Sequence, residues 1–264
     1  MLFRYEKLYV DVVTADGAVC VAYATWLKIA GLAFSSAGYE TYGVDGSRAV
    51  VHATGAIEMD REHDGRVSLR FATDRGPWTM TLQSGPGGRS PPHRLTPHLS
   101  WQVLVARGEA RTEGGGNASF HGLGYSDWVE MTRPPRLLGL RALQWGRGHI
   151  AGDSLVFTQA EFNDGKAFRV ALINDEQTFD LALRRTSDRT LEVHAAGTAV
   201  SLHQERVLHA GAALDQERFP GRAERLVARA FGGNIVETRM ISRARSHAGL
   251  EGAALHEQVS FGGT

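Results

Sequence analysis

The sequence has 264 residues, 42% of them apolar, which is enough to bury one large core or two ordinary ones. Lysine plus arginine and aspartate plus glutamate balance at 29 each. That balance provides no net field to attract nucleic acid or an anionic membrane, so a neutral or apolar small molecule is the expected partner. The single cysteine, Cys20, excludes an intramolecular disulfide and is interpreted as a small buried core residue.

The sequence contains no stretch close to the roughly 18 apolar residues of a membrane helix. Its N-terminus also lacks the long apolar region of a secretion signal. We therefore expect a cytoplasmic protein without stable membrane insertion, and the sequence leaves the oligomeric state open.

Short apolar and β-branched runs fill the first half of the chain. Asp16-Gly17, Asp45-Gly46 and Asp64-Gly65 separate such runs and are typical of hairpin turns that need a positive φ. The stretch 85–97 is rich in glycine and proline, which predicts a long loop. Strands are predicted, in chain order, at residues 5–14, 19–26, 34–44, 49–59, 66–73, 78–83, 101–112 and 118–130.

The second half begins after Pro134-Pro135 and repeats this pattern. Between residues 220 and 231 apolar residues recur at helical spacing, which predicts one short helix near the C-terminus. Two similar halves indicate an all-β protein made of two antiparallel barrels in tandem, residues 1–133 and 134–264. The further predicted strands are residues 143–150, 154–162, 167–174, 178–185, 191–196, 200–207, 235–245 and 253–261.

Unusual residue types concentrate in two neighbouring strands. Tyr125 and Asp127 share one face of the first strand, and Trp145, Arg147 and His149 share one face of the next, because alternate residues of a strand point the same way. If the two strands pair, one wall holds an acid, a phenol, an indole, a guanidinium and an imidazole.

An aspartate and an arginine beside aromatic rings have two interpretations. Asp127 and Arg147 can form a buried structural ion pair, since a carboxylate in a core is normally neutralised by a partner. Alternatively, Asp127 is a binding or acid–base group, because an apolar cavity raises the pKa of a carboxylic acid and lets it deliver a proton near neutral pH.

The motif Gly-x-Gly-Tyr-x-Asp at 122–127, followed by Trp-Gly-Arg at 145–147, resembles the hydroxyneurosporene synthase family. That family contains carotenoid 1,2-hydratases, AttH-like proteins and, more distantly, Diels-Alderase-type cyclases. Residues 3–17 and 252–259 extend the resemblance over the whole chain. It implies two lipocalin-like (calycin) barrels in tandem, a ligand cavity at or near their junction, and no metal or organic cofactor.

The resemblance also assigns roles to residues. Asp127 is then the acid that protonates an isolated double bond, with Tyr125 beside it, and His98 and Trp101 correspond to a histidine and a tryptophan upstream of the motif. With Trp145, Arg147 and His149, these two form the expected substrate-binding set. No His-x-x-x-His pair or second cysteine supports a metal site.

Two functions from different classes fit these expectations. The first is a cofactor-independent hydratase, isomerase or cyclase that acts on a hydrophobic unsaturated molecule of isoprenoid or polyketide type. The second is a carrier or sensor that binds such a molecule unchanged, as lipocalin-like barrels commonly do.

Overall fold

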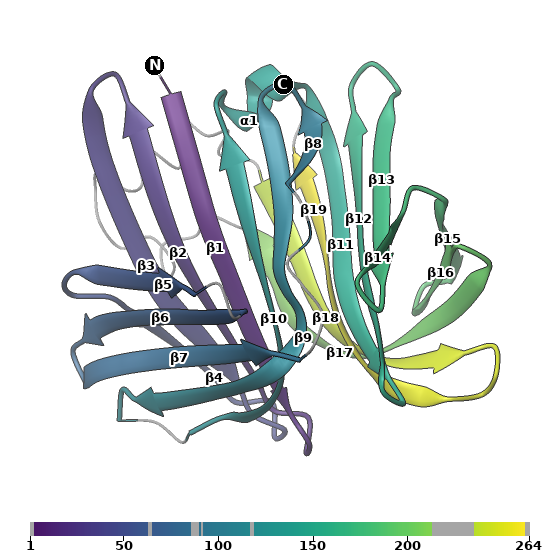
Figure 1. The fold of residues 1–264 in the computed structure, drawn as a ribbon, viewed down its shortest axis with the longest axis horizontal. Coiled ribbons are helices and arrows are strands. Elements are labelled where there is room, and N and C mark those ends of the chain that lie inside the picture. The colour runs from purple at the N-terminus through teal and green to yellow at the C-terminus, as the bar shows by residue number, and fades with distance from the viewer. Residues whose placement is uncertain are drawn as a thin grey trace. The chain divides into compact units, whose positions relative to one another are not determined.

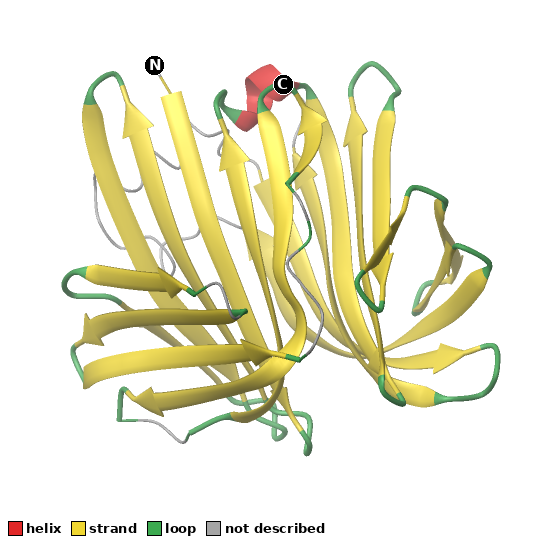
Figure 2. Cartoon of the chain, in the orientation of Figure 1, coloured by secondary structure: helices red, strands yellow, loops and turns green. Residues whose placement is uncertain are grey.

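The computed structural model describes residues 3–62, 65–85, 90, 92–116, 119–212 and 235–261. Strands dominate these residues and are joined by one short helix, α1 (Pro135–Leu138) (Figures 1 and 2). The strands form two antiparallel sheets, which confirms the predicted all-β fold of two lipocalin-like barrels in tandem. No helix in the described ranges is long and apolar enough to span a membrane.

The first compact unit extends to Pro134 and contains one curled sheet with the order β4-β3-β2-β1-β10-β9-β7-β6-β5, with β8 paired to β9. The first strand therefore pairs with the last, and the two strands at the edges follow each other in the chain. The strands are β1 (Phe3–Thr14), β2 (Val19–Ile29), β3 (Leu32–Tyr42), β4 (Arg48–His52), β5 (Ile57–Arg61), β6 (Arg66–Thr73), β7 (Gly76–Ser84), β8 (His93–Thr96), β9 (Leu99–Gly114) and β10 (His121–Met131).

The link between the two edge strands bridges the opening of the first barrel. The amide of Ala53 donates to the carbonyl of Ala37 in β3, and the next amide, Thr54, donates to the carbonyl of Ala72 in β6. Adjacent residues thus bond to strands on opposite sides of the opening. The backbone groups at these edges are in this way partly satisfied without a direct β4–β5 ladder.

The second compact unit begins at Pro135 and has the same plan, with the order β14-β13-β12-β11-β19-β18-β17-β16-β15. Its first and last strands again pair, and its edge strands are again consecutive. The strands are β11 (Leu140–Ile150), β12 (Asp153–Phe162), β13 (Ala167–Ile173), β14 (Glu176–Thr178), β15 (Leu181–Ser187), β16 (Thr190–Ala195), β17 (Thr198–Ala212), β18 (Ile235–Ser246) and β19 (Glu251–Phe261).

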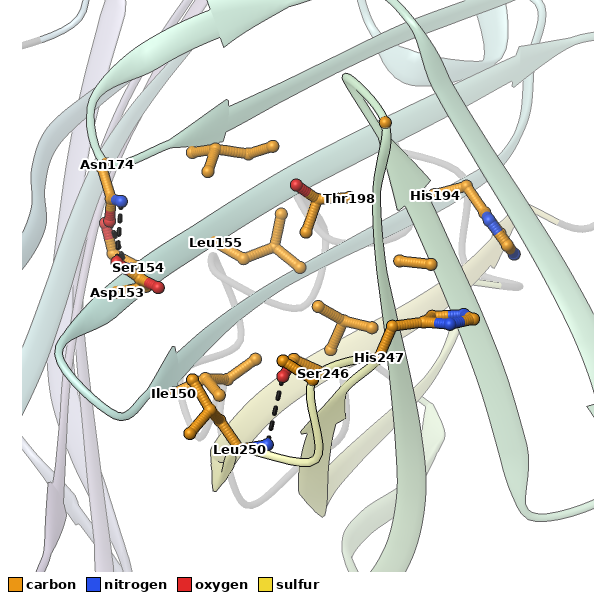
Figure 3. A pocket seen from close by; sticks show the side chains of 15 residues that line it. Ile150, Asp153, Ser154, Leu155, Asn174, His194, Thr198, Ser246, His247 and Leu250 are labelled. Atoms are coloured by element: carbon orange, nitrogen blue, oxygen red, sulfur yellow. Dashed lines mark hydrogen bonds between the residues drawn. The ribbon is translucent and has the colours of Figure 1, made fainter.

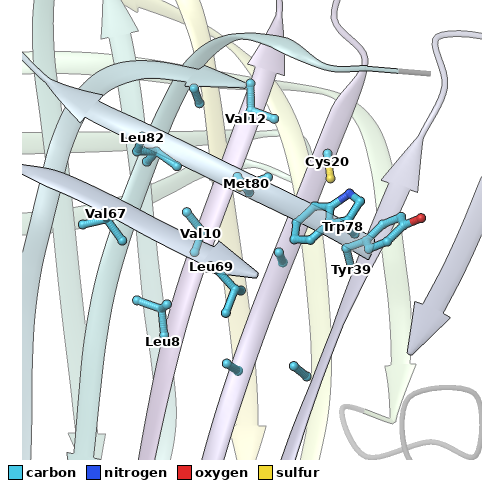
Figure 4. Close-up of a cluster of buried hydrophobic side chains, with 14 of the residues drawn as sticks. Leu8, Val10, Val12, Cys20, Tyr39, Val67, Leu69, Trp78, Met80 and Leu82 are labelled. Atoms are coloured by element: carbon cyan, nitrogen blue, oxygen red, sulfur yellow. The ribbon is translucent and has the colours of Figure 1, made fainter. Parts of the chain in front are cut away.

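Side chains fill the interior of the first barrel. Alternate residues of β1 and β2, such as Val10 and Cys20, point inward and belong to the same buried cluster as Tyr39 and Trp78 (Figure 4). These two rings stack with centroids 4.6 Å apart, and Phe71 lies 5.0 Å from Trp78. The core is therefore closed by aromatic packing.

The structure corrects several sequence predictions. The predicted strands 49–59 and 178–185 are each divided in two, because the chain passes from one edge of each sheet to the other at these points. The predicted loop 85–97 contains β8, which pairs with the start of β9. The predicted helix at 220–231 lies outside the described residues, and α1 was not predicted.

The aromatic stack gives a stability prediction. Replacing Trp78 by alanine should lower the free energy of unfolding by about 3–5 kcal/mol, because it leaves a large cavity beside Tyr39 and Phe71. Urea denaturation measures this loss. Phe179→Ala, at a ring that is 62% exposed, is the control and should change stability by no more than about 0.5 kcal/mol. An equally small loss for Trp78→Ala would contradict a core closed by this stack.

Candidate functional site

The sequence-predicted acid, Asp127, lies on β10 between β1 and β9. Its register partners are Tyr9 on β1 and Val103 on β9, whereas the inward-pointing Val10 pairs with Ser126. Asp127 therefore points away from the barrel core, although only 4% of it is exposed. The β9–β10 ladder shifts register on both sides of Ser126, and such bulges often re-aim side chains at functional sites.

Two neutral donors hold one oxygen of Asp127. The indole Nε1 of Trp101 donates to Oδ2 at 2.9 Å, and the phenol of Tyr125 donates to the same oxygen at 2.8 Å. The structure thus brings three sequence-predicted site residues together on one face. These hydrogen bonds stabilise the carboxylate form, while burial favours the neutral acid, so the two effects on the acidity of Asp127 oppose each other.

Further acidic and phenolic groups share this outer face of the first barrel. Asp11 lies opposite Tyr125 in the β1–β10 ladder, and Glu40 lies two strands away on β3, across Val21 of β2; both acids are fully buried. Burial and then the nearby carboxylates raise the pKa of Tyr125 well above 10. Its phenol therefore keeps its proton at neutral pH and acts as a donor to Asp127.

The histidine beside Trp101 is His93, not the predicted His98. His98 lies in the β8–β9 turn, where its Nδ1 is 3.0 Å from the hydroxyl of Thr132. His93 is the register partner of Trp101, and the two ring centroids are 5.7 Å apart. Burial lowers the pKa of His93, and its Nε2 has no hydrogen-bond partner among the described residues. A His–Trp spacing of eight residues on two paired strands was the signal that the sequence analysis missed.

The other predicted site residues belong to the second barrel. Trp145, Arg147 and His149 share the outer face of β11 and are buried. The strands of Asp127 and Arg147 are not paired, because β10 lies between β1 and β9, and β11 lies between β12 and β19. The predicted pairing of these two strands is therefore wrong.

A buried ionic network occupies the outer face of the second barrel. The indole Nε1 of Trp145 donates to Oε2 of Glu257 at 3.0 Å. The guanidinium of Arg239 donates to the other oxygen of Glu257 and pairs with Glu237 at 3.0 Å. The adjacent guanidinium favours the ionised form of Glu257. Glu257, Arg239 and Glu237 are not among the predicted site residues, because they lie on β18 and β19, far from Trp145 in sequence.

The two buried carboxyls occupy equivalent positions in the two barrels. Gly122 lies opposite Thr14, and Gly252 lies opposite Ile150; Asp127 and Glu257 each follow their glycine by five residues. A Cβ at either glycine would overlap with a backbone carbonyl of the facing strand, so neither position accepts another residue without a shift. Each barrel therefore uses the same backbone frame to present an acid on the last strand opposite an aromatic residue on the first.

The interior of the second barrel contains a buried serine–histidine pair. The hydroxyl of Ser242 and Nε2 of His256 are 2.8 Å apart, on neighbouring strands. Burial, and then the charge of Arg185, lower the pKa of His256 to about 4. The imidazole is therefore neutral at pH 7. Within the described part of the chain, no group of three potential metal ligands gathers.

Comparison with known proteins finds solved structures that share this fold. Comparisons with protein-family models and with curated protein sequences find no match. Solved structures do match at 12% identity: an AttH-like protein from Nitrosomonas europaea (TM-score 0.62, covering 99% of this chain and 93% of that one), and CghA bound to Sch210972 (TM-score 0.62, 98% and 89%). Kievitone hydratase from Nectria haematococca also matches (TM-score 0.58, 97% and 88%). These neighbours agree with the resemblance seen in the sequence, and at this identity they show the fold.

The low pKa of His256 predicts a pH-dependent stability. The unfolded chain binds a proton at His256 near pH 6.5, but the folded protein does so only near pH 4. The free energy of unfolding should therefore fall as the pH is lowered from 6.5 to 4, by up to about 3 kcal/mol from this residue.

Urea denaturation at several pH values measures this effect. His256→Gln should remove this part of the slope, and His203→Gln, at an exposed position, should retain it. An unchanged slope in His256→Gln would show that the buried imidazole does not resist protonation.

Proposed function

We propose that the protein is a cofactor-independent enzyme that hydrates, isomerises or cyclises a hydrophobic unsaturated molecule, with Asp127 as the general acid. The observation that carries the proposal is the buried Trp101–Asp127–Tyr125 cluster, in which two neutral donors bind one carboxyl oxygen. Support for the reaction class comes from the shared fold, which a kievitone hydratase and CghA also use. The isoprenoid or polyketide nature of the substrate belongs to the same proposal.

The chemistry requires an acid whose conjugate base is stabilised as soon as the proton leaves. With Oδ2 accepting two hydrogen bonds, the proton of the neutral acid resides on Oδ1. In hydration, this proton adds to an alkene carbon and leaves a tertiary cation and the Asp127 carboxylate. Water then bonds to the cation and returns a proton to the carboxylate, so the acid is regenerated. Aromatic rings such as those of Trp101 and Tyr125, which both bond to Asp127, are of the kind that stabilises a nearby cation.

His93 provides a second polar group for the same substrate. A buried imidazole nitrogen that has no hydrogen-bond partner among the described residues is costly, and a ligand hydroxyl or the attacking water can satisfy it. Since burial keeps His93 neutral, the ring can hold such a group without adding charge. We assign it to binding or positioning, beside the acid.

Asp127→Asn tests the acid, because it keeps the shape of the side chain and removes the proton. Wild-type protein is incubated with a panel of isoprenoid alcohols and polyenes in isotopically labelled water, and products are followed by mass spectrometry. Hydration adds the mass of one labelled water, whereas cyclisation changes the retention time alone. Asp127→Asn should reduce the rate by about two to four orders of magnitude with folding largely intact.

Glu130→Gln is the matched control, since Glu130 lies on the same strand and pairs with Arg4 at 3.3 Å, outside the cluster. It should retain the wild-type rate. An Asp127→Asn variant that melts early, yet turns over normally while folded, would show that Asp127 is a structural group. Wild-type protein that converts no member of a broad panel would count against an enzyme of this class.

A further inference from the structure

One end of the second barrel contains a cavity of about 720 Å³ (Figure 3). The turns β11–β12, β16–β17 and β18–β19 surround its mouth, together with the end of β13. Its volume lies within the roughly 300–1,000 Å³ typical of small-molecule sites. None of its lining residues belongs to the Asp127 cluster of the first barrel.

The floor of the cavity is aliphatic. Ile150, Leu155 and Val200 line it and are also members of the core cluster of the second barrel, with at most 5% of each exposed. The cavity therefore reaches the barrel core, and no phenylalanine, tyrosine or tryptophan lines it. Small residues explain the space: the described core cluster has one aromatic member, Phe157, and the alanines Ala171, Ala195, Ala244 and Ala254.

The polar groups lie at the mouth and differ between its two sides. On one side, Asn174 donates to Asp153 at 2.9 Å and accepts from the amide of Ser154 at 2.8 Å, so these groups satisfy each other. The other side presents the hydroxyl of Thr198 and the imidazole of His247 (Figure 3). These groups can bond a polar ligand head, while lysine and arginine are absent from the lining.

We propose that this cavity, defined by Ile150, Leu155, Val200, Thr198 and His247, is a second ligand site that binds an aliphatic molecule with one neutral polar head, such as a long-chain alcohol. The chain lies on the aliphatic floor, and the hydroxyl bonds at the mouth. The lack of a phenylalanine, tyrosine or tryptophan in the lining disfavours flat ring systems, which gain most from stacking. The lack of a lysine or arginine disfavours a carboxylate head.

The first experiment maps binding directly on the wild-type chain with 1-dodecanol and methyl NMR. Dodecanol should shift the methyl signals of Ile150, Leu155 and Val200 and leave those of Leu8 and Val12, in the core of the first barrel, unchanged. Dodecanoic acid at pH 7 should bind at least about tenfold more weakly, a difference of about 1.4 kcal/mol. Equal binding of the acid would overturn the neutral-head assignment, and unshifted floor methyls would overturn the site.

The second experiment blocks the mouth and follows dodecanol binding through the same floor methyl signals. Ala248→Trp and Thr198→Trp, both at exposed positions of the mouth, should each weaken dodecanol binding at least about tenfold. Ala182→Trp, at an exposed position of β15 outside the lining, is the matched control and should keep the wild-type affinity. Melting curves establish that each variant is folded.

These measurements do not use turnover, so their outcome is independent of the role of Asp127. If the mouth variants bind dodecanol normally while Asp127→Asn or Tyr125→Phe abolishes binding, the molecule occupies the first barrel's cluster, and the second site is refuted. If the floor methyls shift and catalysis is never observed, the second site stands without the proposed enzyme.

Discussion

The pairing of the first strand with the last is the constraint on which each barrel depends. It joins segments more than a hundred residues apart. The chain must therefore lose the entropy of closing that long loop before the hydrogen bonds of the ladder can form. The same pairing positions the chemistry, since it sets Tyr9 opposite Asp127 and Trp145 opposite Glu257. Gly122 and Gly252 allow the strands to approach closely enough for this register. The candidate sites are therefore a direct consequence of barrel closure.

Burying carboxyls on the outer faces of the sheets has a free-energy cost that hydrogen bonds must offset. Asp127 receives an indole and a phenol donor, and Glu257 receives an indole and a guanidinium. Charged donors form the stronger bonds and hold a carboxylate in its ionised form. The two donors to Asp127 are neutral, so these bonds favour its ionised form less than the guanidinium favours that of Glu257.

Much of the fold could be predicted from the alternation of apolar and polar residues and from turn-forming residues such as Asp-Gly pairs. The predictions that were wrong have physical causes. The strand at 66–73 was predicted with its observed bounds, because turn residues flank it on both sides. The strands predicted at 49–59 and 178–185 are each two strands in the structure. The alternation of apolar and polar residues continues across each barrel opening, although the hydrogen-bond partners change there. β8 was missed because Pro92 and Pro97 flank it, and it pairs only with the start of β9.

The site was predictable only where its residues are neighbours in sequence. Tyr125 and Asp127 share a strand, so their common face follows from the two-residue period. The indole donor was found through a resemblance, and His93 was missed, because strand pairing sets the contact between His93 and Trp101. The supposed pairing of β10 with β11 failed for a similar reason. Consecutive strands are usually neighbours, but here each first strand pairs instead with the last strand of its own sheet.

The equivalence of the two barrels separates what folding requires from what it leaves open. Some equivalent positions on the last strands of the two barrels carry the same residue type: glycine at Gly122 and Gly252, and valine at Val129 and Val259. On the outer face the matched residues differ: Asp11 corresponds to Arg147, and Tyr125 corresponds to Leu255. The same backbone plan thus accepts opposite charges at the first of these positions, and either a phenol or an aliphatic side chain at the second. An acid that faces an aromatic residue nevertheless recurs in both barrels, as Asp127 opposite Tyr9 and Glu257 opposite Trp145, so the frame retains this pair while the residues around it change.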